Sequence, residues 1–415
     1  MKKVLIFGAG GFVGPYLAEE FRQHGYEVFG SDIQETDVTG HFCCQACDQS
    51  VRWTRLSGAP GDCCDATQSQ GQPLAEKPVE SSAESSAENG QPQQENIGLK
   101  NAHPCYFQAD LLDAESVKSV IHTCAPDIIV NLAAVSSVGV SWNIPQTTIS
   151  VNVVGALNIM EAARACISMP KLLLVGSSEE YEIKMPAAGK HKKAADTAAG
   201  ADRESRMSAE SSPAAADGIS EETPLNANNL AADGISEETP LNANNPYGIS
   251  KMAQESFAQM YRERYGMKIY CVRPFNHTGV GQRDSFVLPS FCRQAAAIEK
   301  SGRPGTIRVG NLAAERDFSD VRDIVRAYRM IVESEDCTEI YNVGSDKAYS
   351  LKELLEYIVS LCSQNITVET DPERFRPVDT PRICCDSRKI RGKLGWEPEY
   401  SIFDTLKEMV EKELG

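Results

Sequence analysis

Residues 2–21 read KKVLIFGAGGFVGPYLAEEF, and this stretch decides the fold. The short apolar run predicts a strand, and the apolar spacing after the glycines is that of a helix. Gly8, Gly11 and Gly14 lie between the two. Glycines at such a junction allow a tight turn and bring a pyrophosphate close to amides at a helix N-terminus. The stretch therefore predicts the first strand, turn and helix of a dinucleotide-binding sheet.

The next apolar segment, YEVFGSD at residues 26–32, predicts a second strand that ends on Asp32, 18 residues beyond Gly14. A carboxylate at this place binds both hydroxyls of a ribose and repels a 2′-phosphate. We therefore expect NAD(H) or NADP(H) as cofactor, with NAD(H) favoured by Asp32.

Strands and helices continue to alternate along the chain. Apolar strand patterns and helical patterns follow one another at residues 105–111, 114–124, 127–134, 148–166 and 171–178. Such alternation of apolar strands with helices is typical of α/β proteins. We expect a Rossmann-type, doubly wound parallel sheet.

Two segments interrupt this alternation, at residues 40–102 and 184–232. Both are biased in composition, poor in large apolar residues and without periodicity. We expect both to be disordered, low-complexity insertions that loop out of the fold. The first insertion contains a cluster of cysteines, Cys43, Cys44, Cys47, Cys63 and Cys64. Their spacing matches no standard zinc site, so no metal is expected.

The phrase AADGISEETPLNANN occurs twice, at residues 215–229 and 231–245. Only the second copy runs on into PYGISK. We interpret the repeat as a tandem duplication without a catalytic role, in which the first copy loops out and the second fits the fold.

Composition limits the classes of function. The chain has 415 residues, of which 41% are hydrophobic and 24% charged, as in ordinary globular proteins. A formal net charge of −17 argues against a nucleic-acid partner. The apolar runs fall short of the roughly 20 residues that a membrane span needs. Glycines interrupt the first apolar run where a signal peptide would continue, so we expect a cytoplasmic location with reduced thiols.

A long helix is predicted from PYGISK onward, with Asn245 as its N-cap and Gly266 just beyond its end. Tyr247 and Lys251 are then four residues apart on one face. A nearby ammonium lowers the pKa of a tyrosine, which would make Tyr247 an acid–base group near neutrality. Tyr-x-x-x-Lys pairs are also common on solvated helix faces, so this signal needs a second one.

The second signal is LLLVGSSEEY at residues 172–181. A strand that ends here delivers Ser177, Ser178 and Glu179 to the carboxyl edge of the sheet, where such folds bind their ligands. A serine hydroxyl at that edge can donate a hydrogen bond to the same substrate oxygen that Tyr247 protonates.

Six motifs together resemble the extended short-chain dehydrogenase/reductases that modify nucleotide sugars. They are GAGGFVG, NLAA, GSSEEY, PYGISK, RPFNHTGVGQ and ERDFSDVRD. The resemblance implies a catalytic triad of Ser177, Tyr247 and Lys251. It implies cofactor contacts at Gly8, Gly11, Gly14, Asp32, Asp110, Leu111, Ala133, Tyr247 and Lys251. It places the nucleotide diphosphate of the substrate near Asn276, Arg316 and Arg376, because guanidinium groups suit phosphate oxygens.

The same resemblance implies a domain division and an assembly. We expect residues 1–275 to form the NAD(P)-binding domain and residues 276–415 to form mainly the domain that binds the sugar nucleotide. A homodimer is expected through paired helices of the sheet domain, one of them beginning at Tyr247.

The motifs are most similar to those of enzymes that use NAD(P)H to reduce the C4 keto group of GDP-4-keto-6-deoxymannose to a GDP-6-deoxyhexose. A 4,6-dehydratase of GDP-mannose is an alternative, with Glu179 as the base. A nucleotide-sugar 4-epimerase is another, and both alternatives retain a tightly bound NAD(P). A non-catalytic, nucleotide-binding regulatory protein is the remaining hypothesis.

Overall fold

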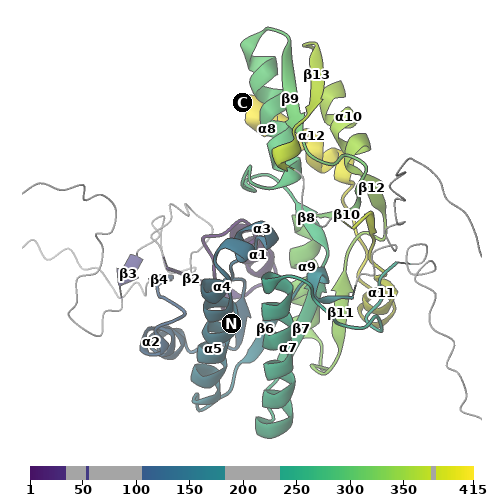
Figure 1. The fold of residues 1–415 in the computed structure, drawn as a ribbon. Helices are drawn as coiled ribbons and strands as arrows, with labels where there is room; N and C mark the ends of the chain where they lie inside the picture. Colours follow the sequence, from purple (N-terminus) through teal and green to yellow (C-terminus); the bar gives the residue numbers. More distant parts are fainter. Residues whose placement is uncertain (34–52, 56–104, 183–233, 375–379) are drawn as a thin grey trace, which may run out of the picture.

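The computed structural model describes residues 1–33, 53–55, 105–182, 234–374 and 380–415 (Figure 1). The second predicted insertion, the clustered cysteines, the first copy of the repeated phrase and Arg376 lie outside the described residues. Of the first predicted insertion the structure describes Trp53–Arg55, which form a strand of the large sheet rather than part of a loop. A large sheet with its helices forms one part of the molecule, and a smaller group of helices and strands forms the other.

The large sheet consists of eight strands among the described residues, in the order β11-β7-β6-β5-β1-β2-β4-β3. Its strands are β1 (Lys3–Phe7), β2 (Glu27–Asp32), β3 (Trp53–Arg55), β4 (Tyr106–Gln108), β5 (Ile128–Asn131), β6 (Lys171–Val175), β7 (Ile269–Pro274) and β11 (Ile340–Val343). All neighbouring pairs in this sheet are parallel. The strand order reverses at β1, because the chain first continues to β2 on one side and later returns to β5 on the other. Such a switch point is where open α/β sheets bind ligands.

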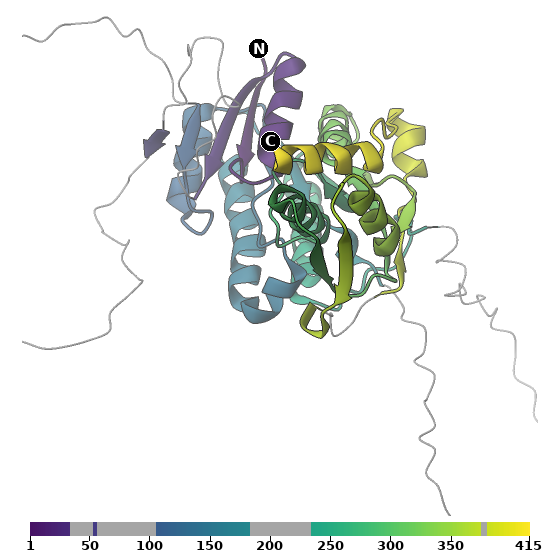
Figure 2. The same cartoon turned by 90° about the horizontal axis from the view of Figure 1, so that it is seen from above.

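Helices cover both faces of this sheet, as Figures 1 and 2 show. One face packs against α1 (Val13–Gln23), α9 (Val321–Glu333) and α11 (Arg388–Leu394), together with the buried ring of Trp396. The other face packs against α2 (Ala114–Cys124), α5 (Gly155–Arg164) and α7 (Pro246–Tyr265). Two separate apolar cores therefore enclose the sheet, and the predicted doubly wound Rossmann-type fold is confirmed.

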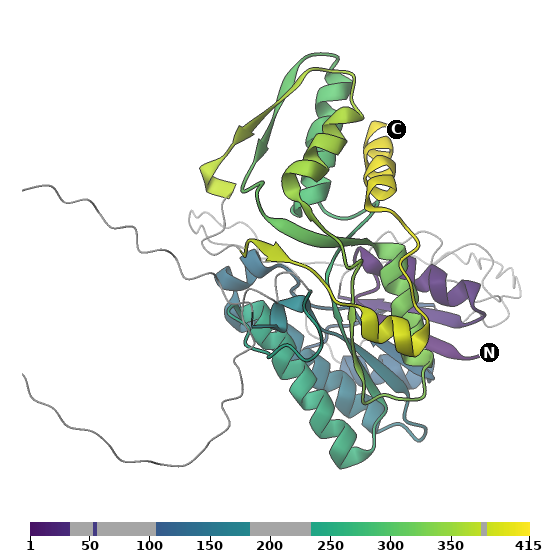
Figure 3. The ribbon, with the colours of Figure 1, turned by 90° about the vertical axis from the view of Figure 1, so that its right-hand side faces the viewer.

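The smaller part is built from residues after 275 (Figure 3). Its strands are β8 (Asn276–Thr278), β9 (Gly305–Val309), β10 (Glu315–Asp320), β12 (Ala348–Ser350), β13 (Ile366–Thr370) and β14 (Arg382–Ile383). Its helices are α8 (Val287–Ser301), α10 (Leu351–Ser360) and α12 (Ile402–Leu414), which share a third apolar core. The predicted domain boundary at residue 275 stays a prediction, and α9 and β11 from beyond it join the large sheet.

The second copy of the repeated phrase is part of the fold from Gly234 onward. Gly234 has a φ of +84°, and a Cβ there would lie 2.7 Å from the carbonyl oxygen of Cys385. Further along, the amide of Glu182 donates to the carbonyl of Pro240 at 2.8 Å, and Thr239 is buried. This copy therefore fits the fold as predicted.

The described helices include none that is both long and apolar enough to cross a membrane.

Candidate active site

The glycine turn after β1 has the shape that its sequence predicts. Gly8 has a φ of +76°, and a Cβ on it would lie 2.6 Å from the amide nitrogen of Ala133. A Cβ on Gly14 would clash with the carbonyl oxygen of Ala9. A Cβ on Gly11 would meet only the carbonyl oxygen of Gly8, at 3.2 Å. Two of the glycines are thus required by the turn itself, and the third leaves room for a ligand beside it.

Asp32 lies at the end of β2, next to this turn. Its Oδ2 accepts a hydrogen bond from the amide of Gly10 at 2.9 Å, and its Oδ1 accepts one from the amide of Ile33 at 2.7 Å. The carboxylate is only partly buried, so its outer side can accept further hydrogen bonds. An acceptor placed beside a phosphate-binding turn suits the ribose of a dinucleotide.

Three more residues predicted to contact the cofactor follow β4 and β5, the strands whose ends lie along the same edge of the sheet. Asp110 is exposed and accepts a hydrogen bond from the amide of Leu112 at 2.9 Å. Leu111 is buried against Gly155. The amide of Ala133 donates to the side chain of Asn131 at 3.1 Å. With the glycine turn and Asp32, these residues fit a dinucleotide lying across the carboxyl edge.

The predicted triad is brought together at this edge by β6 and α7. Asn245 caps α7, accepting a hydrogen bond from the amide of Gly248 at 2.9 Å, which places Tyr247 in the first turn. Ser177 follows β6 after Gly176, and its side chain lies close enough to Tyr247 to lower the pKa of the tyrosine. The Nζ of Lys251 lies 5.9 Å from the centre of the Tyr247 ring.

Burial dominates the electrostatics of this group. It raises the pKa of the Tyr247 hydroxyl well above 10, against a smaller lowering by the hydrogen bond with Ser177. It also lowers the pKa of Lys251 to about 8, partly opposed by the negative charge of Glu180. The sequence-based expectation that Lys251 lowers the pKa of Tyr247 is therefore wrong for this structure. Its ammonium instead donates to the carbonyl of Val175 at 2.7 Å.

Glu179 lies between Ser177 and the start of α7. Its amide donates to the hydroxyl of Ser177 at 3.2 Å, and its Oε2 accepts a hydrogen bond from the side chain of Asn245 at 3.0 Å. The negative charge of Glu179 also acts on Tyr247. Glu179 therefore borders the triad, with its amide on Ser177 and its carboxylate on the N-cap of α7.

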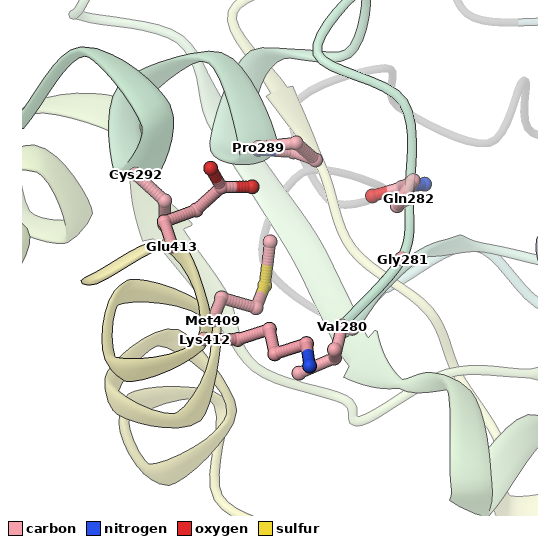
Figure 4. A pocket seen from close by; sticks show the side chains of 9 residues that line it. Val280, Gly281, Gln282, Pro289, Cys292, Met409, Lys412 and Glu413 are labelled. Carbon is pink, nitrogen blue, oxygen red and sulfur yellow. The ribbon is translucent and has the colours of Figure 1, made fainter. Parts of the chain in front are cut away.

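The predicted substrate residues lie on neighbouring strands of the smaller part. Asn276 begins β8 and is exposed, and it is in register with Phe318 of β10. Arg316 on β10 is largely buried, and its Nη1 donates to the carbonyl of Glu315 at 2.8 Å. The hollow in Figure 4 lies elsewhere, between the loop after β8 and the helices α8 and α12. It is lined by Gly279, Val280, Gly281, Gln282, Pro289, Cys292, Met409, Lys412 and Glu413, and so by none of the predicted site residues.

Glu180 and Arg273, both buried behind Ser177, are not among the residues expected from the sequence. Glu180 accepts a hydrogen bond from the amide of Ser177 at 2.7 Å, and Arg273 forms a bidentate ion pair with Glu255. The one signal in the sequence is the pair of adjacent acidic residues Glu179 and Glu180 after a strand. Neighbouring side chains at such a place point in different directions, so one of the two can point into the protein.

The chain is similar to known proteins in sequence and in structure. A family model described as GDP-mannose 4,6 dehydratase matches residues 77–184 and 229–409. GDP-6-deoxy-D-mannose reductase from Pseudomonas aeruginosa is 26% identical over 308 residues, which cover 73% of this chain and 85% of the relative. GDP-mannose 4,6 dehydratase 2 from Arabidopsis thaliana is 28% identical over 312 residues, which cover 74% of this chain and 70% of the relative.

Solved structures of other proteins share the fold. A putative epimerase from Burkholderia cenocepacia is 25% identical, with a TM-score of 0.65 and coverage of 100% of this chain and 98% of its own. RMD from Pseudomonas aeruginosa, complexed with NADPH, is 20% identical, with a TM-score of 0.64 and coverage of 100% and 99%. UDP-glucose 4-epimerase from Thermus thermophilus, in complex with NAD, is 21% identical, with a TM-score of 0.64 and coverage of 100% and 99%.

Proposed function

Because the chain belongs to the GDP-mannose 4,6 dehydratase family of extended short-chain dehydrogenase/reductases, we propose that it reduces the C4 keto group of a nucleotide-diphospho-4-keto-6-deoxy sugar. The substrate is GDP-4-keto-6-deoxymannose and the product a GDP-6-deoxyhexose. One observation carries the proposal. Ser177 and a buried Tyr247, whose pKa the serine hydroxyl lowers, lie together at the carboxyl edge of the sheet, where the glycine turn after β1 also lies.

The cofactor is NADH or NADPH, held by the glycine turn, Asp32, Asp110, Leu111 and Ala133. When bound, it supplies the hydride. The position of Asp32 favours NADH, since a 2′-phosphate would meet a carboxylate that already faces the turn.

Tyr247 then donates its proton to the oxygen at C4, and the Ser177 hydroxyl stabilises the same oxygen by a hydrogen bond. The raised pKa of Tyr247 supports this direction, because a reduction begins with the protonated hydroxyl. An enzyme that begins by oxidising a C4 hydroxyl needs the phenolate. Lys251 fixes the start of α7 through Val175 and holds positive charge beside the ring.

The diphosphate of the substrate is proposed to bind Asn276, Arg316 and Arg376. Asn276 supports this by its exposure at the start of β8, directly after the strand that packs under α7. Guanidinium groups bind phosphate oxygens with two parallel hydrogen bonds, which explains why arginines are expected here.

A second candidate is GDP-mannose 4,6-dehydration, which the position of Glu179 favours. The residue follows Ser177 at the spacing of a base that abstracts a proton beside a transient ketone, and its charge acts on Tyr247. The hydrogen bond from Asn245 holds the carboxylate at the start of α7. This candidate retains its cofactor and consumes none.

We further propose a homodimer through α7 and the short elements packed against it. These are α3 (Val138–Asn143), α4 (Pro145–Ile149) and the π-helix η1 (Ser150–Val154). Together they expose apolar side chains of Val140, Trp142, Ile149, Val154, Ile249 and Met260. An apolar surface shared by packed helices is typical of an interface, and a second copy presents the same surface to it.

The decisive experiment is a coupled assay. Purified protein is mixed with GDP-4-keto-6-deoxymannose and either NADH or NADPH, and the absorbance of the reduced nicotinamide is followed. Stoichiometric oxidation is expected, faster with NADH. Conversion of GDP-mannose to a 4-keto product without net use of cofactor would instead establish the dehydratase.

A further inference from the structure

Glu180 is a fully buried carboxylate that the reaction proposed above does not use. Its Oε1 accepts a hydrogen bond from the amide of Ser177 at 2.7 Å, while the Ser177 hydroxyl caps the short 3-10 helix η2 (Ser178–Glu180). A Cβ on Gly176 would clash with the same oxygen. Glu180 therefore holds the main chain of Ser177 by a hydrogen bond. The carboxyl group fits there because residue 176 is a glycine without a side chain.

The second oxygen of Glu180 has an incomplete environment. Among the described residues, Oε2 has no hydrogen-bond partner, and the Nε of Arg273 lies 3.9 Å away. Arg273 forms its hydrogen bonds with other groups, because it donates to both carboxylate oxygens of Glu255 and to the hydroxyl of Tyr181 at 2.9 Å. The negative charge of Glu180 is thus only partly neutralised by Arg273.

Charged and titratable groups face Glu180 from α7 and from β7. They are Tyr247, Lys251 and Glu255 on α7, and Cys271 and Arg273 on β7. The charge of Glu180 raises the pKa of both Tyr247 and Lys251. The lone carboxylate behind the serine therefore acts on the other two members of the triad.

We propose that Glu180 is a positioning residue of the reduction: its carboxyl group holds the main chain of Ser177 in place, and its ionised form favours the protonated forms of Tyr247 and Lys251. The inference rests on the proposed function, because protonated Tyr247 matters only if it is the proton donor.

The titration of the group supports this role. Burial, with a further contribution from Glu255, raises the pKa of Glu180 to about 8, against a lowering by Arg273. Burial lowers the pKa of Lys251 from 10.5 to about 8. Glu180 is therefore largely uncharged at neutral pH. As its charge develops above a pH of about 8, it strengthens the hold of Lys251 on its proton, so the two ionisations are coupled.

The first test is Glu180→Gln, which keeps an acceptor for the Ser177 amide and removes the charge. Without that charge the pKa values of Tyr247 and Lys251 fall, so the alkaline limb of the turnover profile should move to lower pH. Carbon-13 labelling of lysine, with the Lys251 resonance assigned through Lys251→Met, follows the amine without any substrate. Its titration midpoint should move in the same direction.

Glu237→Gln is the matched control. Glu237 is also a partly buried glutamate that accepts a main-chain hydrogen bond, from Asn342 at 2.7 Å, and burial raises its pKa too. Its replacement should leave the Lys251 midpoint and the alkaline limb where they are. An equal shift in both variants would mean a general change of structure and would overturn the inference.

Glu180→Leu tests the hold on Ser177. Turnover should fall by about 10²-fold with KM almost unchanged, because a displaced serine weakens the transition state more than substrate binding. Wild-type turnover in this variant, or an unmoved Lys251 midpoint in Glu180→Gln, contradicts the proposal. If Glu180→Gln does not fold, Lys251 is titrated in the wild type instead. A titration of Lys251 in a single step would then contradict its coupling to Glu180 and so the proposal. The titration midpoint of Lys251 could move in Glu180→Gln although the protein reduces no 4-keto sugar. That result would contradict the proposed reaction and leave the electrostatic effect of Glu180 on Lys251 in place.

Discussion

The ammonium of Lys251 donates a hydrogen bond to the main-chain carbonyl of Val175, with 2.7 Å between Nζ and the oxygen. Val175 is the last residue of β6, so this bond ties the second turn of α7 to the edge of the sheet. Only 3% of Lys251 is exposed, which makes its charge expensive to bury.

Lys251→Met should stabilise the protein at neutral pH. The pKa of Lys251 is about 8 in the fold against 10.5 in the unfolded chain. Between these values the unfolded state binds more protons, so this group makes stability rise with pH, and below about 8 it is destabilising by about 3 kcal/mol. Loss of the hydrogen bond to Val175 offsets about 1 kcal/mol of the stability gained by Lys251→Met.

Urea unfolding of the wild type and Lys251→Met at several pH values measures this effect. The advantage of the variant should shrink as the pH rises from about 8 towards 10.5. The exposed Lys118 provides the control, since Lys118→Met should leave the pH dependence unchanged. A variant that is less stable at every pH would contradict the prediction.

Tyr247→Phe should reduce turnover by about 10²- to 10⁴-fold, because it removes the proposed acid. Binding of the nicotinamide cofactor, measured by fluorescence titration, should remain close to that of the wild type. Tyr261→Phe on the same helix is the control, since its hydroxyl bonds to Glu161 away from the triad. Full activity of Tyr247→Phe would remove Tyr247 from the mechanism.

Glu179→Gln separates the two candidate reactions. A reductase has no step that requires a base at Glu179. Turnover of the 4-keto sugar by the variant should therefore be of the same order of magnitude as that of the wild type. A dehydratase would lose about 10²- to 10⁴-fold of its activity on GDP-mannose. Product analysis with both substrates, with Glu182→Gln as the neighbouring control, shows which loss occurs.

The repeated phrase allows a matched pair of variants. Gly234→Val should destabilise the fold by about 1–3 kcal/mol, because the residue has a φ of +84° and its Cβ would press on the carbonyl of Cys385. Gly218 is the same position of the first copy, and Gly218→Val should leave thermal unfolding unchanged. Deletion of residues 215–230 should likewise retain activity. Equal effects of the two valines would contradict the assignment of the second copy to the fold.

Ile249→Asp should dissociate the proposed homodimer. Ile249 is 49% exposed on the apolar surface of α7, where a buried carboxylate would have no partner. Sedimentation velocity is expected to show a dimer for the wild type and a monomer for the variant. Ile167→Asp is the control, because Ile167 is an exposed isoleucine outside that surface. A wild-type monomer would refute the proposal directly.

Local features of the fold could be predicted from the sequence because their causes are local. The cap at Asn245 and the left-handed Gly266 are set by neighbouring residues, and both bound α7 as predicted. The glycine turn and the spacing of Tyr247 and Lys251 are local in the same sense. The rule that parallel strands end at one edge placed Ser177 at that edge, and the resemblance to the family placed Tyr247 beside it.

What the sequence could not supply depends on distant packing. Nothing near Glu180 in the chain indicates that Arg273, 93 positions later, stands behind it already bound to Glu255. Desolvation of Tyr247 likewise arises from the whole edge of the sheet, which is why four-residue spacing to Lys251 gave the wrong direction for its pKa.

The core shared by β1, α9 and Trp396 has a consequence for synthesis on the ribosome. Val4 and Trp396 belong to one apolar cluster, as do Ile324 and Tyr328 of α9. Apart from the part that α1 covers, this face of the sheet therefore stays exposed until almost the entire polypeptide has emerged. Nascent chains that stop before α9 should expose this face to chaperones and aggregate when released.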